Sequence, residues 1–283
     1  LRAEPSHIVA GLVAEGPAAP GSTVTLAVTM QPEKGWHGYW RNPGDAGLGL
    51  TLDWELPQGW TAGALEYPVP KAMLYQGLMN HVFETDYAVL VPVRVPADAY
   101  AGQVVPVRAK ASWLACTEQI CVPESGEIAT SVTVGPAGSA TRDARFDGWR
   151  AALPAPLGAE ARFVVEGGSI RIGIPLPRSV ALQGQHLFPD ENHIIDYAAP
   201  QDFRRIGDLL TVTLKRPAMA AIDPATIGGV LRLNARGDGL AFAARPGPVP
   251  GGGEPVSADA ARPALPLALL LLAALAGGLL LNV

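Results

Sequence analysis

Cysteine is nearly absent from this sequence, since Cys116 and Cys121 are the only two among 283 residues. A closed zinc site takes four ligands, usually cysteine or histidine. None of the five histidines lies within thirty residues of the two cysteines. The sequence therefore disfavours a metal site built around this pair.

Charged and aromatic residues are also scarce, at 17% and 6%, and the net charge is −5. Domains that bind nucleic acid carry clustered Lys and Arg, so we expect no nucleic-acid partner. The chain instead has 48% hydrophobic residues, 32 Gly and 27 Pro. This composition can fill packed cores, and its many turn residues favour short strands over long helices. We predict an all-β protein.

Strand patterns bounded by turn residues recur about every ten residues through residues 1–135, which is typical of an immunoglobulin-like β-sandwich. The length of the chain leaves room for a second domain. Further strand patterns in residues 143–245 predict a second β-sandwich, preceded by one short helix that places Phe146 and Trp149 on the same face.

The two ends of the chain lie outside these domains. Residues 1–5 lack the apolar core of a typical signal peptide, and we expect them to be a mature or trimmed start. Residues 246–263 are rich in Pro and Gly and predict a flexible linker. The uncharged stretch that follows is at the short limit for a membrane span. We therefore expect residues 264–283 to begin a transmembrane helix, cut inside its first span.

The two cysteines lie between two runs of alternating apolar residues, 105–113 before Cys116 and 127–134 after Cys121. Residues two apart in a strand share a face, so both runs predict strands. The cysteines are then expected at the end of a strand, in or beside a tight connection. Loops at such positions commonly display reactive groups.

The neighbours of each cysteine give different expectations for its surroundings. Cys116 ends the apolar run 113–115, so we expect it to be the more buried of the two. Cys121 precedes Val122 and Pro123, and the proline is expected to leave little room for regular strand pairing there.

Three chemistries remain open for the pair on spacing alone. The first is a structural disulfide, although closing a loop of about six residues stabilises a fold by only roughly 2 kcal/mol. The second is a metal site that finds its other ligands elsewhere in the chain. The third is a redox-active dithiol, in which one thiolate attacks a partner and its neighbour resolves the intermediate.

Residues 113–125, WLACTEQICVPES, resemble the cysteine motif in the N-terminal periplasmic domain of the DsbD and ScsB family of transmembrane thiol reductases. Residues 35–47, GWHGYWRNPGDAG, resemble the WHxYWRNPGDxG stretch of the ScsB-like branch. Residues 67–70 and 87–93 match in the same order, and the resemblance is close over residues 35–124.

The resemblance implies an electron relay with protein-disulfide reductase activity. The Cys116–Cys121 pair would take electrons from a thioredoxin-like domain of the same full-length protein and reduce oxidised periplasmic thiol proteins. In DsbD-type domains the second cysteine bonds the partner, which carries that role onto Cys121. The implied location is the bacterial inner membrane, with this region in the periplasm. No cofactor beyond the disulfide is implied. The resemblance does not decide whether the protein serves copper tolerance, cytochrome maturation or the recycling of a disulfide isomerase.

The same resemblance suggests which residues surround the pair. The aromatic stretch that contains Trp36, His37, Tyr39 and Trp40 is expected beside the cysteines, where His37 could assist a proton transfer. Residues 68–80 are expected to form an irregular stretch that covers the cysteines, with Tyr75 and Gly77 as the covering residues.

One alternative from a different class stays open. The chain could be a non-catalytic β-sandwich binding module whose disulfide is static. Such a module could bind copper, because thioethers and imidazoles suit Cu(I) and Met73, Met79 and His81 lie close together in the sequence.

Overall fold

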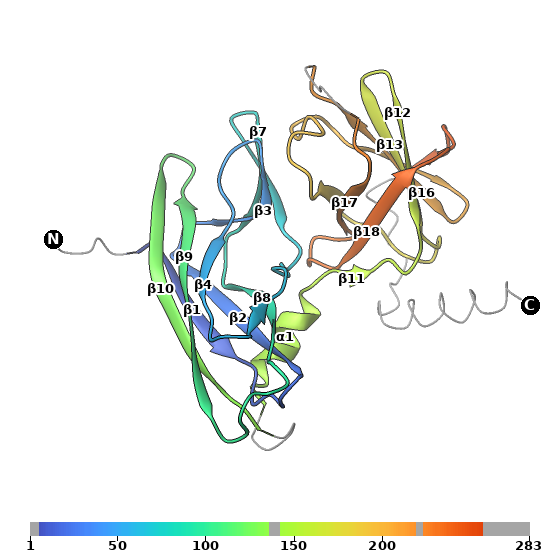
Figure 1. The fold of residues 1–283 in the computed structure, drawn as a ribbon. Helices are drawn as coiled ribbons and strands as arrows, with labels where there is room; N and C mark the ends of the chain where they lie inside the picture. The colour runs from blue at the N-terminus through green and yellow to red at the C-terminus, as the bar shows by residue number, and fades with distance from the viewer. Residues whose placement is uncertain (1–5, 136–141, 219–222, 257–283) are drawn as a thin grey trace, which may run out of the picture. The chain divides into compact units, whose positions relative to one another are not determined.

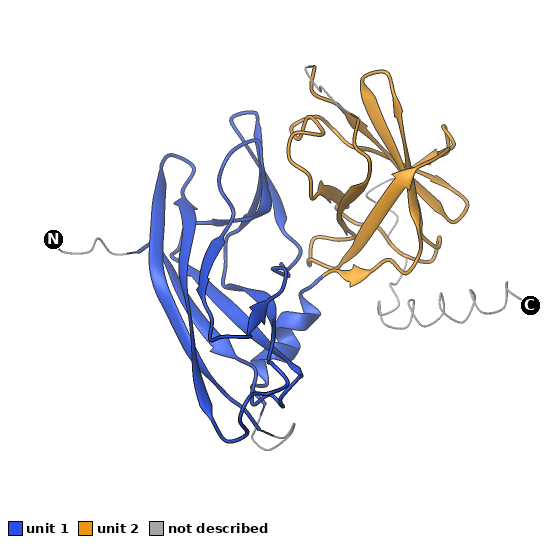
Figure 2. Ribbon diagram, in the orientation of Figure 1, with its two compact units in different colours: residues 1–153 blue, residues 154–283 orange. Residues whose placement is uncertain are grey.

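The computed structural model describes residues 6–135, 142–218 and 223–256 and divides the chain into two compact units, residues 1–153 and 154–283 (Figures 1 and 2). Each unit is built almost entirely of β-strands. The all-β prediction is therefore confirmed.

Unit 1 contains three sheets, ordered β1-β2-β8-β5, β10-β9-β4 and β3-β7-β6. The strands, in chain order, are β1 (Ile8–Ala14), β2 (Thr23–Pro32), β3 (Gly38–Gly44), β4 (Thr51–Glu55), β5 (Thr61–Ala62), β6 (Lys71–Tyr75), β7 (Leu78–Phe83), β8 (Tyr87–Arg94), β9 (Val104–Cys116) and β10 (Cys121–Thr133).

Alternation along the strands places the core of unit 1 between the first two of these sheets. In β9 the odd-numbered residues from Val105 to Ala115 are buried, whereas the even-numbered residues from Val104 to Lys110 are exposed. The neighbouring strand β10 also contacts β1, so the two sheets form the layers of a sandwich (Figure 1). Each fully buried aliphatic side chain in this core contributes roughly 2 kcal/mol to stability.

Helix α1 (Arg145–Ala151) covers the other face of the β1-β2-β8-β5 sheet. Phe146 is fully buried in a cluster with Ala27, Ala88 and Leu90, and Trp149 packs against that cluster. The prediction of a helix with these two aromatic residues on one face is confirmed. Its assignment to the second domain, which placed the start of that domain at residue 143, is corrected because the apolar face of the helix packs on unit 1.

The segment 68–80 differs from the sequence prediction, because it forms the β6–β7 hairpin instead of an irregular stretch. The two residues that connect these strands, Gln76 and Gly77, have φ values of 49° and 83°. Positive φ at both central residues is the geometry of a type I′ turn. Gln-Gly is not the usual Asn-Gly or Asp-Gly signal for that turn, so the hairpin was missed.

Unit 2 contains one nine-stranded sheet, ordered β14-β17-β18-β12-β13-β16-β15-β19, with β11 paired to β18. The strands are β11 (Ala155–Pro156), β12 (Ala161–Glu166), β13 (Ser169–Pro175), β14 (His186–Pro189), β15 (Asp202–Ile206), β16 (Leu209–Lys215), β17 (Ile227–Arg232), β18 (Gly239–Pro246) and β19 (Glu254–Pro255).

One side chain links two non-adjacent parts of this sheet. Gln201, which directly precedes β15, accepts a hydrogen bond from the Leu187 N–H of β14 at 2.8 Å and donates one to the Leu187 carbonyl at 2.9 Å. The amide of Gln201 thus forms strand-like hydrogen bonds with β14, although β14 and β15 are not neighbours in the sheet order.

The predicted linker, residues 246–263, is corrected for its described part. Val249 is 7% exposed, and β19 pairs with β15 through Glu254 and Arg205. Pro and Gly do not prevent an extended segment from packing on a sheet edge when an apolar residue such as Val249 is available. These residues therefore belong to unit 2.

The predicted transmembrane segment, residues 264–283, and the end of the linker lie outside the described residues. In the part of the chain that the structure describes, no helix has the length and apolar character needed to cross a bilayer.

Candidate functional site

The two cysteines form a disulfide across the turn end of the β9–β10 hairpin. Cys116 is the last residue of β9 and Cys121 the first of β10, they are directly opposite in the register, and their Cα atoms are 4.1 Å apart. The intervening turn is held by a hydrogen bond of 2.8 Å from the Thr117 N–H to the Ile120 carbonyl. The Thr117 hydroxyl oxygen also accepts bonds from the N–H groups of Gln119 and Ile120. The disulfide therefore sits at the end of a well-ordered hairpin.

Regular pairing in β10 begins at Cys121, which corrects the expectation that Pro123 disrupts it. Val122 lies opposite Ala115, and Pro123 lies opposite Leu114. Since β10 is the edge of its sheet, a proline that lacks an N–H can be accommodated without loss of a ladder hydrogen bond on its outer side.

The two sulfur-bearing residues differ sharply in exposure. Cys116 is 1% exposed, in line with the apolar run that precedes it, whereas Cys121 is exposed. A reagent or partner protein can therefore reach the disulfide from the Cys121 side.

His37 is the neighbour of Cys116 on the side opposite Cys121. The His37 N–H donates to the Cys116 carbonyl at 2.9 Å, and the Cys116 N–H donates to the His37 carbonyl at 3.1 Å. Side chains of directly opposed antiparallel residues lie on one face, with Cβ atoms about 4.5–5.5 Å apart. The side chains of His37, Cys116 and Cys121 thus form a row across three adjacent strand ends.

Tyr39 lies two residues beyond His37 and shares its face. The His37 Nε2 and the Tyr39 hydroxyl are 3.4 Å apart, and the two side chains are 4% and 5% exposed. Burial lowers the pKa of His37, against the opposing effect of Glu84 and Glu118, and burial raises the pKa of Tyr39. At neutral pH the imidazole is therefore uncharged and the phenol is protonated.

The β3-β7-β6 sheet covers Cys116. Tyr39 and Val82 are an opposed pair in that sheet, and both belong to a buried cluster with Cys116. Met73 of β6 and Leu114 of β9 pack against the cluster. The Cys116 side chain is therefore enclosed between two sheets, which explains its low exposure although it lies on the outer face of β9.

The structure places the two predicted covering residues differently. Tyr75 lies two residues from Met73 in β6 and therefore shares the face that covers Cys116. Gly77 lies in the turn, and a Cβ added to it would meet no atom within 4 Å. Gly77 therefore serves the turn conformation, and the residues that contact Cys116 from this hairpin region are Met73 and Val82.

Neither of the two tryptophans predicted beside the pair joins the Cys116 cluster. Trp36 stacks on His7, with ring centroids 3.6 Å apart and an interplanar angle of 5°. Trp40 is fully buried, 6.0 Å from the ring of His81. Alternation explains the second case, because Trp40 points to the opposite face from Tyr39.

The methionine and histidine residues considered for copper do not converge. Met73 is opposite Asn80 in the β6–β7 register, so Met79 and His81 point to the other face of the hairpin. His81 is fully buried, and its Nδ1 lies 2.8 Å from the Asn42 carbonyl oxygen. Within the described residues, no three His, Cys, Asp or Glu side chains form a group that could hold a metal ion.

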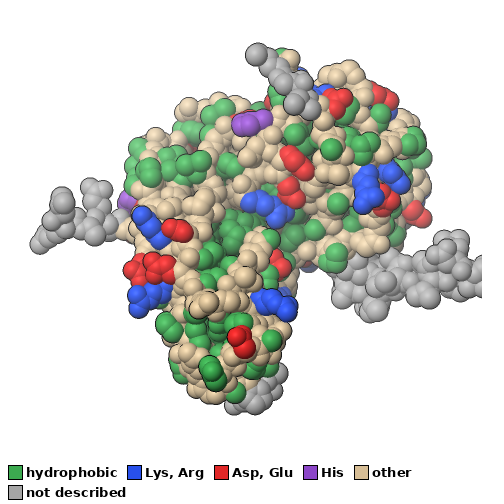
Figure 3. Space-filling model, viewed as in Figure 1, with side chains coloured by type: hydrophobic (Ala, Val, Ile, Leu, Met, Phe, Trp, Pro, Cys, Tyr) green, Lys and Arg blue, Asp and Glu red, His purple; other side chains and the backbone are tan. Residues whose placement is uncertain are grey.

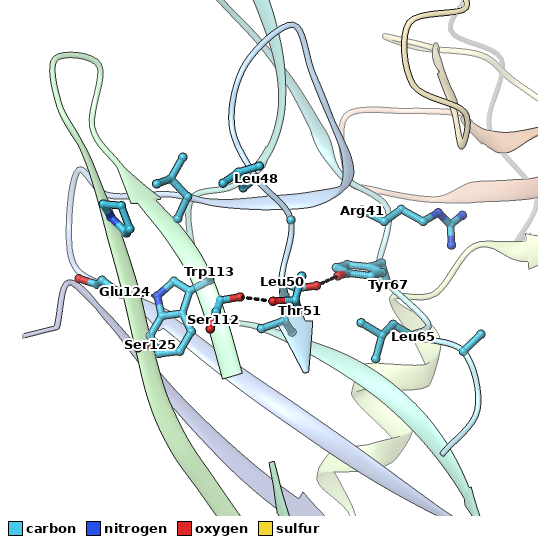
Figure 4. Close-up of a pocket in the computed structure, with 14 residues that line it drawn as sticks. Arg41, Leu48, Leu50, Thr51, Leu65, Tyr67, Ser112, Trp113, Glu124 and Ser125 are labelled. Atoms are coloured by element: carbon cyan, nitrogen blue, oxygen red, sulfur yellow. Dashed lines mark hydrogen bonds between the residues drawn. The ribbon is translucent and has the colours of Figure 1, made fainter. Parts of the chain in front are cut away.

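A pocket of about 750 Å³ lies on the β10-β9-β4 sheet (Figure 4). Leu114 and Pro123, which line it, are the next opposed pair on the same face as the cysteines. The Tyr67 hydroxyl donates to the Leu50 carbonyl at 3.4 Å on its far wall. The lining is mainly apolar, with no constellation of acid, base and nucleophile.

Glu124 has a structural role that the sequence analysis missed. Its carboxylate accepts hydrogen bonds from the His7 N–H at 2.6 Å, the Ser6 hydroxyl at 2.7 Å and the Trp113 Nε1–H at 2.8 Å. Burial raises the pKa of Glu124, but these bonds and a fourth from the Ile8 N–H outweigh burial and hold the pKa below its usual value. Glu124 thus fastens the start of β1 to the hairpin. Only the tertiary structure reveals it, because Ser6, His7 and Ile8 are over a hundred residues away in the sequence.

The surface carries charges of both signs. On the face shown in Figure 3, Lys and Arg side chains are interspersed with Asp and Glu and with hydrophobic side chains. Pairs such as Lys71–Glu84, at 3.0 Å, and Arg108–Glu127, at 3.6 Å, contribute to this mixture. No broad surface of a single sign appears on that face.

Comparison with known proteins identifies a matching family model and a solved structure of similar fold. Residues 10–133 match the family model described as thiol:disulfide interchange protein DsbD, N-terminal. The N-terminal periplasmic domain of ScsB from Proteus mirabilis matches with a TM-score of 0.64 at 14% identity, over 86% of this chain and 94% of that chain. At this identity the structural match shows the fold alone.

Other comparisons add little. The YadV chaperone matches at 8% identity with a TM-score of 0.25, over 85% of this chain and 100% of that one. BcpA, the major pilin subunit of Bacillus cereus, matches at 8% identity with a TM-score of 0.26, over 83% of this chain and 62% of that one. No curated protein sequence matches the chain.

Proposed function

We propose that this chain, whose residues 10–133 belong to the DsbD and ScsB family of N-terminal domains, passes electrons through its Cys116–Cys121 disulfide. In this proposal it acts as a protein-disulfide reductase module within a longer protein. It takes electrons from a thioredoxin-like domain and passes them to oxidised periplasmic proteins.

The observation that carries the proposal is the unequal exposure of the two cysteines. Thiol–disulfide exchange proceeds through a mixed disulfide, so one sulfur must be reachable while the other stays close enough to resolve the intermediate. Cys121 is exposed and Cys116 is 1% exposed, at the end of one hairpin. A purely structural role is less well supported, because a loop this short stabilises the fold by only roughly 2 kcal/mol.

The first half-reaction reduces the domain. A partner thiolate attacks the Cys121 sulfur, a bond forms between the two, and the bond between Cys121 and Cys116 breaks. The electron pair of the broken bond stays on Cys116 as a thiolate. The second thiolate of the partner then attacks the partner's own first sulfur, which completes the partner's disulfide and releases Cys121.

The second half-reaction runs in the opposite direction on a periplasmic protein. The Cys121 thiolate attacks the disulfide of that protein and forms a mixed disulfide. The Cys116 thiolate then attacks Cys121, which restores the Cys116–Cys121 bond and releases the protein in its reduced form. The domain returns to its starting state after a net transfer of two electrons.

The location and anchoring follow from the same family membership. We place this region in the periplasm and expect the full-length protein to be held in the bacterial inner membrane. The thioredoxin-like partner belongs to the same full-length protein in this proposal.

Equilibration of the protein against glutathione and dithiothreitol buffers, with alkylation of free thiols, tests the function. A relay is expected to exchange near the range of thioredoxin-like proteins, around −200 to −270 mV. A static disulfide is expected to resist reduction until the buffer is below about −300 mV. The second result would favour the alternative function, a non-catalytic β-sandwich binding module.

A further inference from the structure

Cleavage of the disulfide leaves a negative charge on the buried sulfur of Cys116. Cys116 is 1% exposed and is packed against Tyr39 and Val82. Transfer of an ionised group to apolar surroundings is costly unless a hydrogen bond compensates it. The Cys116 thiolate formed in the first half-reaction therefore needs a donor within this enclosure.

His37 and Tyr39 are the polar side chains that the strand pairing brings to Cys116. His37 is directly opposite Cys116 and shares its face, and Tyr39 belongs to the same buried cluster as Cys116. The nearest charged groups that act on His37 are the carboxylates of Glu84 and Glu118. Carboxylates accept hydrogen bonds and cannot stabilise a thiolate, whereas His37 and Tyr39 both carry a side-chain donor and lie beside Cys116.

His37 and Tyr39 together have one more hydrogen-bond donor than the contact between them uses. The uncharged imidazole carries one N–H and the phenol carries one O–H. The contact between His37 Nε2 and the Tyr39 hydroxyl uses one of these two protons. Among the described residues, neither side chain forms another hydrogen bond, so one proton is left for a further acceptor on the enclosed side.

We propose that the His37 ring donates its N–H to the Cys116 sulfur when the disulfide breaks, and that Tyr39 positions it. The Tyr39 hydroxyl donates to Nε2, which keeps the imidazole proton on Nδ1, the nitrogen nearer the backbone that pairs with Cys116. His37 then acts on the reacting sulfur, whereas Tyr39 acts through His37. This inference rests on the proposed exchange function and adds to it the group that stabilises the leaving thiolate.

The same contact serves the return reaction. The Cys116 thiol must lose its proton before it attacks Cys121, and a hydrogen bond to the thiolate lowers the thiol pKa. No oxidant or reductant beyond the partner thiols is required, because His37 and Tyr39 change neither their oxidation state nor their number of bonds.

Tyr39→Phe is the first test, because it removes one hydroxyl and keeps the buried ring. With dithiothreitol as the reductant, we expect the rate of disulfide reduction to fall about tenfold, the effect of one hydrogen bond to a charged group. In the reduced Cys121→Ser protein, which retains only Cys116, we expect Tyr39→Phe to raise the Cys116 thiol pKa by about one unit. Thiolate absorbance in the ultraviolet measures that pKa.

Tyr67→Phe is the matched control. Tyr67 is 3% exposed, and its hydroxyl donates to the Leu50 carbonyl rather than to a group beside Cys116. This substitution is expected to leave both the reduction rate and the Cys116 pKa unchanged. Nitrogen-15 NMR of His37 in the unsubstituted protein provides a second readout, and it should show the proton on Nδ1.

The outcomes separate this inference from the proposed function. An unchanged rate and an unchanged Cys116 pKa in Tyr39→Phe would overturn the inference, as would a proton on Nε2 of His37. If the unsubstituted protein fails to exchange with thiol buffers but Tyr39→Phe still raises the Cys116 pKa, the hydrogen bond is supported and the relay is refuted.

Discussion

The two units of this chain differ in what they bury. Among the described residues, unit 1 buries four polar side chains, which are His37, Asn42, Asn80 and His81, whereas unit 2 buries one, Thr211. All four in unit 1 lie in β7, in β3 or directly before β3. They are therefore concentrated in the small sheet that covers Cys116.

The polar side chains buried in unit 1 are held by hydrogen bonds. Burial of a polar group is costly unless a hydrogen bond compensates it. The Asn42 Oδ1 accepts from the Gly44 N–H at 3.1 Å, and the His81 Nδ1 lies 2.8 Å from the Asn42 carbonyl oxygen. Unit 1 thus keeps hydrogen-bonded polar groups in the sheet that covers its disulfide. We interpret unit 1 as the unit shaped for chemistry and unit 2 as the unit shaped for stability.

The largest effect expected from this comparison of the two units is a difference between the two cysteines of unit 1 in trapping a partner protein. In Cys116→Ser the exposed Cys121 remains, and we expect it to trap a covalent complex with a thioredoxin-like domain that retains only its attacking cysteine. In Cys121→Ser the buried Cys116 remains, and we expect at least tenfold less complex on non-reducing gels.

Two results of that trapping experiment would count against the roles given to unit 1. Equal trapping by both variants would remove the distinction between an attacked and a leaving sulfur. No trapping by either variant would count against the relay as a whole.

The next effect tests whether the units are stabilised separately. Phe146 and Phe188 are both fully buried, the first in helix α1 of unit 1 and the second in β14 of unit 2. Each Phe→Ala substitution is expected to lower the free energy of unfolding of its own unit by about 3–5 kcal/mol. Calorimetry should show one transition shifted in each variant. If Phe146→Ala shifted the unfolding transition of unit 2 instead, the helix would belong to the second domain, as the sequence predicted.

A smaller effect is a difference in acid stability. Burial lowers the pKa of His81 to about 4, against a small opposing effect of the Asn42 carbonyl. Between about pH 6.5 and 4 the unfolded chain binds a proton at His81 that the folded unit does not bind, so stability falls as the pH falls. The loss reaches about 3 kcal/mol at pH 4.

Denaturant unfolding of each unit at several pH values measures this difference. Unit 2 buries no histidine among its described residues and should lose less stability over the same range. An equal loss in the two units would show that His81 does not cause it. In unit 1, His81→Asn should flatten the dependence on pH.

The smallest effect concerns the ion pairs that fasten the helix to unit 1. Glu15 accepts hydrogen bonds from Arg150, one of them at 2.7 Å, and from Arg142. The hydrogen bond from Arg150 is the largest cause that lowers the pKa of Glu15, to about 2. The stabilisation is complete above about pH 4.5 and is lost as the pH falls toward 2. At pH 7, Glu15→Gln should lower the free energy of unfolding by about 1–2 kcal/mol.

The matched substitution in unit 2 is Asp196→Asn. Asp196 pairs with Lys215 at 2.8 Å, but the lysine side chain is 66% exposed, so the expected loss is below about 1 kcal/mol. Urea unfolding of both variants decides the comparison. A larger loss for Asp196→Asn would contradict the importance given to the helix junction.

Alternation and composition determined much of this protein from the sequence alone. The period of two in residues 105–113 predicted the strand before Cys116, and the spacing of Phe146 and Trp149 predicted a helix face. The apolar run before Cys116 predicted its burial. These features depend on residues that are neighbours in the chain, so local geometry suffices to infer them.

Only the tertiary structure decided which strands become neighbours. His37 and Cys116 are far apart in the sequence, yet their backbones pair. The Pro/Gly segment that contains Val249 packs on unit 2, and Gln76 adopts a positive φ in a turn that lacks the usual residues. Alternation defines the two faces of a strand but not the strand beside it. That choice depends on packing between distant segments. The resemblance placed the aromatic stretch near the cysteines, and the structure decided that Tyr39, unlike Trp36 and Trp40, joins the buried cluster of Cys116.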